Sequence, residues 1–399
     1  MKLFASRIIG AAAIAAMMLP SGVMAQEARD FADKLSATFK SYSTFEIKFG
    51  SAIADGDNII LSDWDIEGVD GSRAQKILDG TVTFEGVQAT ANGGYTAERA
   101  VFNDIDFTDD GIRLEVRNIF ASNIEIFADP DADILDTMML YQGFSAGPVK
   151  VTLEDREVFR IDSIVSTSAI NDDRNEYVSN YAISGIYGDL SQIDDSDMND
   201  ALKMFDLTEI NASMSGDMAW IIDTGLLSII DSSIDIDGVG ELIINADILG
   251  YTLELAQSMQ EQGKAMQEMD ATSSQAEMAG MQLLMSMAAQ LSVSDISIRF
   301  NDDSVTNNVL DFIAAEQGVS RKGFVTMALS ILPSILGPLG MPALQEQVIE
   351  AATSFLTNPG NIEIKAEPAE PVPFMALFAA TQNPSIANEL LNISITANQ

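Results

Sequence analysis

Ser145 stands in the pattern G-x-S-x-G at residues 143–147, which has the form of a hydrolase nucleophile elbow. In such an elbow a histidine activates the serine, and the elbow sits between a strand and a helix. The chain contains no histidine and no cysteine. It therefore cannot build a Ser-His-Asp triad or a cysteine nucleophile, and we interpret residues 143–147 as a flexible turn.

Asp223 begins the triplet Asp-Thr-Gly, which resembles the active-site loop of aspartic proteases. That chemistry requires two carboxylates that share a proton. The nearby Asp231 lacks the following glycine, so a second loop would come from a symmetric dimer. More generally, a carboxylate-based hydrolase needs two acids about 5–10 Å apart. We keep this enzyme as the least favoured alternative and assign no catalytic residue.

Aspartates alternate along residues 129–133, as they do in a calcium-binding loop. Ile134 occupies the position where that loop needs a glycine, and no glutamate follows at the last ligand position. Because 60 of the 399 residues are Asp or Glu, such clusters arise from composition alone. The sequence therefore predicts neither a dedicated metal site nor a cofactor, and weak calcium binding to the acidic loops stays an alternative.

Methionines recur along residues 253–291, which we predict to form two amphipathic helices joined by a bend. Methionine side chains are flexible and fill irregular apolar space, so they suit an adaptable apolar groove. The candidate ligand-binding residues are Met259, Met266, Met269, Met278, Met281 and Met285. We expect a lipid or another apolar ligand between these helices and a sheet. The alternative is that they cover a packed core in an envelope scaffold or protein-interaction module.

The charge balance restricts the partners. With 21 basic residues against 60 acidic ones, the formal net charge is −39. Such a chain repels nucleic acids and anionic lipid headgroups. We therefore expect no nucleic acid among its partners, and expect either an apolar ligand or another envelope protein.

Residues 1–25 have the pattern of a cleavable signal peptide. Lys2 and Arg7 form its positive end, residues 8–19 its apolar core, and the expected cut precedes Gln26. The apolar run is shorter than the ~20 residues that span a membrane. We therefore predict a periplasmic protein without a stable transmembrane anchor. The absence of cysteine suits that oxidising compartment.

Apolar and polar residues alternate with a period of two from Phe45 to Ile248, which is typical of antiparallel strands with one face toward a core. Two strand-rich stretches, 45–127 and 148–248, are candidates for diverged copies of one unit. The expected strands are residues 45–49, 60–66, 82–87, 101–107, 112–116, 149–153, 158–161, 177–187, 210–222, 232–236 and 242–248.

Helical patterns flank this region. A short helix is expected at 27–40. Further helices are expected at 305–317, from Ser320 until Pro333 interrupts it, at 342–356 and at 374–391. Strands at 293–300, 362–365 and 393–395 alternate with them. We predict an α+β fold in which curved antiparallel β-sheets occupy residues 26–250, and a helical cap at 251–399 contributes three more strands.

Segments 308–318, 355–365 and 371–373 resemble uncharacterised exported proteins of alphaproteobacteria. The strand-rich front, with Gly-Val turns at residues 68–69 and 86–87, is loosely similar to the AsmA-type and YdgA-type envelope families. This resemblance implies an envelope location and phospholipid handling, and it implies no catalytic residues. We therefore expect a non-enzymatic periplasmic envelope protein.

Overall fold

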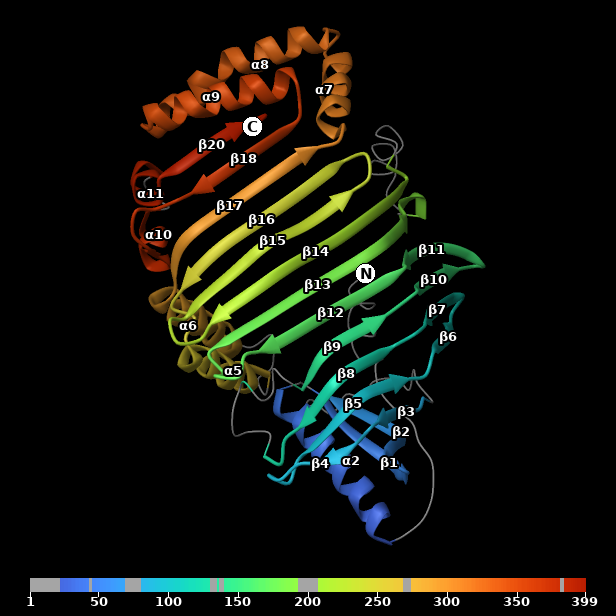
Figure 1. The fold of residues 1–399 in the computed structure, drawn as a ribbon. Coiled ribbons are helices and arrows are strands. Elements are labelled where there is room, and N and C mark those ends of the chain that lie inside the picture. Colours follow the sequence, from blue (N-terminus) through green and yellow to red (C-terminus); the bar gives the residue numbers. More distant parts are fainter. Residues whose placement is uncertain are drawn as a thin grey trace. The chain divides into compact units, whose positions relative to one another are not determined.

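The computed structural model describes residues 22–42, 45–68, 80–129, 135, 140–192, 207–267, 274–380 and 384–399. Its fold is α+β and its strands pair antiparallel in curved sheets, as the alternating pattern predicted (Figure 1). The chain divides into two compact units, which we call unit 1 and unit 2. Unit 1 comprises residues 1–172, 181–183 and 256–283, and unit 2 comprises residues 173–180, 184–255 and 284–399.

Unit 1 is built from short strands joined mainly by tight turns. Its strands pair in the order β1–β2–β3–β5–β8–β9–β12, β4 pairs with β5, and a further ladder runs β6–β7–β10–β11. Their bounds are β1 (Phe45–Asp55), β2 (Asn58–Gly68), β3 (Val82–Glu85), β4 (Gln88–Ala89), β5 (Tyr95–Phe102), β6 (Ile105–Asp109), β7 (Ile112–Val116), β8 (Phe120–Ile126), β9 (Tyr141–Ala146), β10 (Val149–Leu153), β11 (Arg156–Ile161) and β12 (Ser163–Ile170).

Helix α2 (Gly22–Tyr42) packs its apolar stripe on the first strands of unit 1. The side chain of Phe31 is fully buried, and its ring meets those of Phe84 and Tyr95 edge-on at 4.8 and 5.3 Å. The helix predicted at 27–40 is confirmed and starts earlier. Residues 1–21 of the predicted signal peptide lie outside the described residues.

Four strands of unit 2, β14 to β17, have 10 to 13 residues each. The strands of this unit pair in the order β14–β15–β16–β17–β18–β20, and β19 also pairs with β17. The three C-terminal strands predicted from the sequence therefore belong to this sheet. Their bounds are β14 (Glu209–Ile221), β15 (Leu226–Ile236), β16 (Gly240–Leu249), β17 (Ser292–Asp302), β18 (Asn361–Ala366), β19 (Val372–Pro373) and β20 (Ile393–Ala397). Strand β13 (Glu176–Asp189) has residues in both units.

The helices of the C-terminal region follow the predicted order. Their bounds are α5 (Leu253–Gln267), α6 (Ser274–Gln290), α7 (Val305–Glu316), α8 (Arg321–Leu336), the 3₁₀ turn η2 (Gly337–Leu339), α9 (Pro342–Thr357), α10 (Phe374–Ala380) and α11 (Pro384–Leu391). Helix α8 begins where predicted, because the hydroxyl of Ser320 accepts a hydrogen bond from the amide of Gly323 at 3.2 Å.

Three local predictions are wrong. Residues 143–146 lie in strand β9, where Ser145 pairs with Phe120, and do not form a flexible turn. The single strand expected at 101–107 is two strands, because the amide of Asn103 turns away to the carbonyl of Thr81. Helix α8 continues through Pro333, which lies one turn before the end of the helix and removes one backbone donor without ending it.

Candidate functional site

The sheet of unit 2 separates apolar from polar side chains. Successive residues of a strand point to opposite faces, so residues paired across strands share a face. On one face the register of β16, β17, β18 and β20 brings together apolar residues only. We call this surface the apolar grid. Its three rows are Leu242–Phe300–Ile362–Ala397, Ile244–Ile298–Ile364–Ile395 and Ala246–Ile296–Ala366–Ile393.

Three of the four residues in the middle row of the grid are open to solvent. Ile244, Ile298 and Ile364 are 37%, 41% and 45% exposed, although they lie on three adjacent strands and contact one another across the sheet. We call these three residues the open row. Adjacent exposed apolar side chains of this kind form a candidate binding surface.

The row next to α9 is covered. Ala351 and Phe355 of this helix form a buried cluster with Ala397 of β20. Phe300 and Ile362 of the first row pack against that cluster, and so does Ile395 at the β20 end of the middle row. Helix α9 therefore closes one end of the apolar face and leaves the open row uncovered.

The other end of the same face is also packed. Trp220 and Val293 lie beyond the third row and are 1% and 0% exposed. The indole of Trp220 donates a hydrogen bond to the carbonyl of Tyr251 at 2.6 Å. The open row is thus flanked along the strands by packed side chains.

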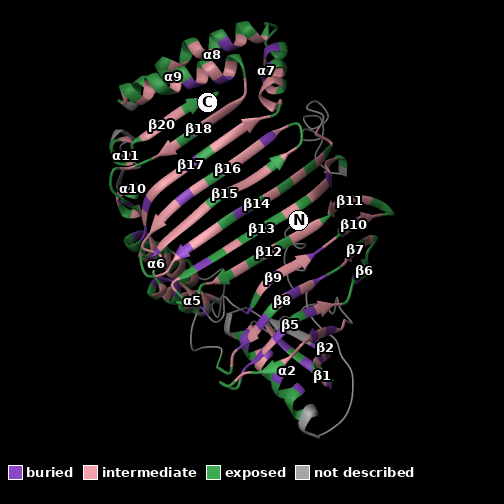
Figure 2. Cartoon of the chain, viewed as in Figure 1, coloured by how far each residue is buried: buried purple, intermediate pink, exposed green. Residues whose placement is uncertain are grey.

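Burial differs between strands of the two units. Most residues of β14 to β18 are intermediate in exposure, whereas β5 and β8 of unit 1 include several fully buried residues (Figure 2). Apolar side chains of unit 2 therefore remain available at a surface.

The opposite face of the unit 2 sheet is polar. Glu363 lies 3.7 Å from both Arg299 and Lys365, so the charges on this face pair with each other. Asp295 is paired in register with Asp247. Burial raises the pKa of Asp295, and the charges of Glu367 and Asp247 raise it further.

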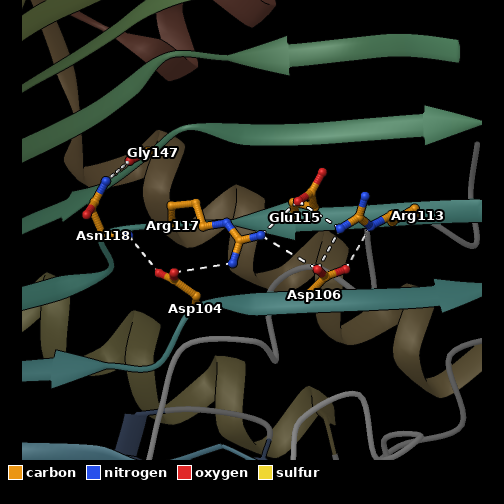
Figure 3. Close-up of polar contacts among 7 residues, drawn as sticks. All are labelled: Asp104, Asp106, Arg113, Glu115, Arg117, Asn118 and Gly147. Atoms are coloured by element: carbon orange, nitrogen blue, oxygen red, sulfur yellow. Dashed lines mark hydrogen bonds and ion pairs between the residues drawn. The ribbon is translucent and has the colours of Figure 1, made fainter. Parts of the chain in front are cut away.

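Unit 1 carries a cluster of ion pairs on the β6–β7 hairpin (Figure 3). Arg113 donates two hydrogen bonds to Asp106, at 2.8 and 2.7 Å. Arg117 binds Glu115 at 2.8 Å and Asp104 at 3.2 Å. The bond from Arg113 holds the pKa of Asp106 below its ordinary value. An acid that stays ionised in this way supports the hairpin and is poorly suited to donate a proton.

The methionines singled out from the sequence lie on two helices. On α6, Met278, Met281 and Met285 are 65%, 63% and 48% exposed and share one side of the helix. On α5, Met259 and Met266 are half-buried. Met269 lies outside the described residues. The three α6 side chains therefore do not fill a core, and their role as ligand contacts stays a prediction.

The carboxylates considered for hydrolase chemistry do not converge within the chain. Asp223 lies in the turn between β14 and β15 and accepts a hydrogen bond from Asn175 at 3.3 Å. Asp231 lies within β15, about 17 Å farther along that strand than Leu226. The acidic run at 129–133 lies mostly outside the described residues. Elsewhere in the described chain, no three acidic side chains form a metal-binding group.

The apolar grid lies in a segment that matches a family model. A family model described as "Uncharacterized protein" matches residues 233–398. No curated protein matches the chain. The matched segment contains all four strands of the grid and helix α9. The sequence pattern predicted one-sided strands but missed the grid as a site, because periodicity does not reveal which part of an apolar face is covered.

Proposed function

We propose that this chain is a non-enzymatic envelope protein of the periplasm that binds the acyl chain of a lipid on the open row. The observation that carries this proposal is the exposure of Ile244, Ile298 and Ile364, side by side on adjacent strands, at 37–45%. Burying such surface under an apolar ligand is favourable because it removes apolar area from water.

The dimensions of the row suit a long, narrow ligand. Strands β16, β17 and β18, which carry the open row, span about 10 Å at ~4.8 Å per strand. The packed rows on both sides leave a strip, and a strip accommodates an extended hydrocarbon chain better than a compact ring system. Each methylene group buried there contributes roughly 0.8 kcal/mol.

The remaining parts of the proposal come from the sequence. The predicted signal peptide and the absence of cysteine support export to the periplasm. The absence of histidine and cysteine, together with the separation of Asp223 from Asp231, supports a role without catalysis. The net charge of −39 favours lipids with zwitterionic or uncharged headgroups.

The test replaces the three isoleucines of the open row by more polar residues that keep the strand propensity. The triple variant Ile244→Thr, Ile298→Thr, Ile364→Thr keeps a β-branched residue at each position, so strand propensity is preserved. Binding is measured by titration with a fluorescent fatty acid. We expect saturable binding by the parent chain and a dissociation constant at least tenfold higher in the variant, a loss of about 1.4 kcal/mol or more.

The matched control is Val165→Thr, which changes a strand residue of unit 1 that is 40% exposed. It should bind the fatty acid as the parent chain does. A parent chain that does not bind, or a triple variant that binds equally well, would contradict the proposal.

A second variant separates the open row from the methionine stripe. The changes Met278→Gln, Met281→Gln and Met285→Gln retain good helix formers on α6. We expect them to leave fatty-acid binding unchanged. If they abolish binding while the threonine variant keeps it, the ligand contacts the methionine-rich helix instead, as the sequence suggested.

A further inference from the structure

Helix α8 lies in the longest part of the mature sequence without charge. No charged residue occurs from Gly323 to Gln345, although 20% of the chain is charged. This uncharged segment includes almost all of α8, the turn η2 and the first residues of α9. Its boundary is marked by two positive residues, Arg321 and Lys322, at the first turn of α8.

One side of α8 is apolar and open. Met327, Ile331 and Ile335 are 42%, 48% and 63% exposed, and their spacing of four residues places them in one stripe along the helix. We call these three residues the α8 stripe. On another side Val325 is buried, and α8 packs against α9, which in turn packs on β20 (Figure 1). The helix is thus held to unit 2 by one side and presents the α8 stripe on another.

We propose that the α8 stripe docks on the surface of a phospholipid bilayer with zwitterionic headgroups, with the helix lying in the plane of the interface. This surface function is separate from the acyl-chain site and does not depend on it.

The uncharged segment favours a bilayer over a protein partner. Protein interfaces are enriched in aromatic residues, Met and Arg at their centres and are surrounded by a polar rim. Of these, the α8 stripe has only Met327. The α8 stripe contains only aliphatic and thioether side chains, and the segment around it contains no charge.

Among the described residues, no single helix is long and apolar enough to cross a membrane. Helices α7 and α8 meet that test only as a pair bent by 93°.

The charges specify the type of bilayer. The net charge of −39 opposes approach to an anionic surface. Arg321 is already held by Asp311 and Asn307, which limits its attraction for anionic lipids. Binding must therefore come from apolar burial, which is insensitive to salt.

The experiment measures cosedimentation of the chain starting at Gln26 with vesicles of pure phosphatidylcholine. We expect binding that is unchanged between about 0.1 and 1 M salt and weakened when phosphatidylglycerol is added. The variant Met327→Gln, Ile331→Gln, Ile335→Gln should bind at least tenfold less. The control Met278→Gln, Met281→Gln, Met285→Gln, with a similarly exposed stripe on α6, should bind as the parent chain does.

A second variant covers the case in which the triple change impairs folding. Ile335→Asp alters only the most exposed residue of the α8 stripe, so it should fold as the parent chain does and bind vesicles severalfold less. Circular dichroism and the melting temperature check the fold of every variant. The threonine variant of the open row should still bind vesicles, which distinguishes this proposal from the acyl-chain site.

Three results would overturn the proposal. The first is a parent chain that does not sediment with phosphatidylcholine vesicles. The second is binding that survives the α8 changes or disappears in high salt. The third is a parent chain that self-associates in solution and becomes monomeric in the α8 variant without losing vesicle binding, since the stripe would then contact a second copy of the chain.

Discussion

Ile298 of β17 lies directly opposite Ile364 of β18, and the two side chains are 41% and 45% exposed. Apolar residues paired in this way normally lie beneath a helix or a second sheet. In unit 2, helix α9 covers the adjacent row and Trp220 is buried toward the other end of the strands. The exposure is therefore local to the open row and does not reflect a poorly packed sheet.

The docking of α2 on unit 1 depends on Phe31. Its side chain is fully buried against Phe84 and Tyr95. We expect Phe31→Ala to lower the free energy of unfolding of unit 1 by about 3–5 kcal/mol, through lost apolar burial and the cavity left behind. Chemical denaturation followed by circular dichroism measures this loss. The control Phe378→Ala, at a side chain that is 59% exposed, should change stability little, and equal losses would contradict the packing.

The carboxylate of Asp30 gives the same contact a pH dependence. Hydrogen bonds from Lys34 and from the hydroxyl of Tyr95, the latter at 2.7 Å, hold its pKa below the ordinary value. A lowered folded pKa contributes stability above the unfolded pKa of ~3.9, and this stability is lost as the pH falls through the folded pKa.

Removing one of the two donors should therefore reduce stability only where Asp30 is ionised. We expect Tyr95→Phe to melt at a lower temperature than the parent chain near about pH 6, with a difference that shrinks toward about pH 2. Melting curves across this range measure the effect. A difference that stays constant with pH would show that the hydroxyl acts without the carboxylate.

The first residue of β16 must be glycine. Gly240 has a φ of +141°, and a Cβ there would lie 2.2 Å from the carbonyl oxygen of Asn301 in β17. We expect Gly240→Ala to destabilise unit 2 by about 3 kcal/mol, since both the backbone and the strand pairing are strained. At Gly238, with a φ of +73° and open space around a Cβ, alanine should cost about 1 kcal/mol. Equal effects in denaturation experiments would contradict this close approach.

The sequence predicted those features that depend on local pattern. Strands such as Ile112–Val116 and helices such as Val305–Glu316 follow from periodicity and turn residues. The break in the strand expected at 101–107 was missed because alternation continues across Asn103, and only the hydrogen bond to Thr81 reveals the turn. Which distant residue accepts such a backbone hydrogen bond is set by the tertiary structure, and the local sequence pattern does not show it.

The exposed part of the candidate site could not be predicted from the sequence for the same reason. The sequence predicted a strand at 242–248 with one face toward a core, and in that strand Ile244 shares a face with Leu242. It did not show that α9 stops short of Ile244, because the coverage of a face depends on where a distant helix packs. The methionines of α6 were predicted to contact a ligand because of their number and spacing. In the structure Met278 and Met281 are exposed and do not lie in a core.

The most direct test of the acyl-chain site is photocrosslinking. A fatty acid carrying a diazirine on its hydrocarbon chain is bound to the parent protein, irradiated, and the labelled residues are identified by mass spectrometry. We predict that labels concentrate on β16, β17 and β18 around Ile244, Ile298 and Ile364, and that excess unlabelled fatty acid removes them. Labels confined to the methionines of α6, or scattered over the surface without competition, would contradict binding on the open row.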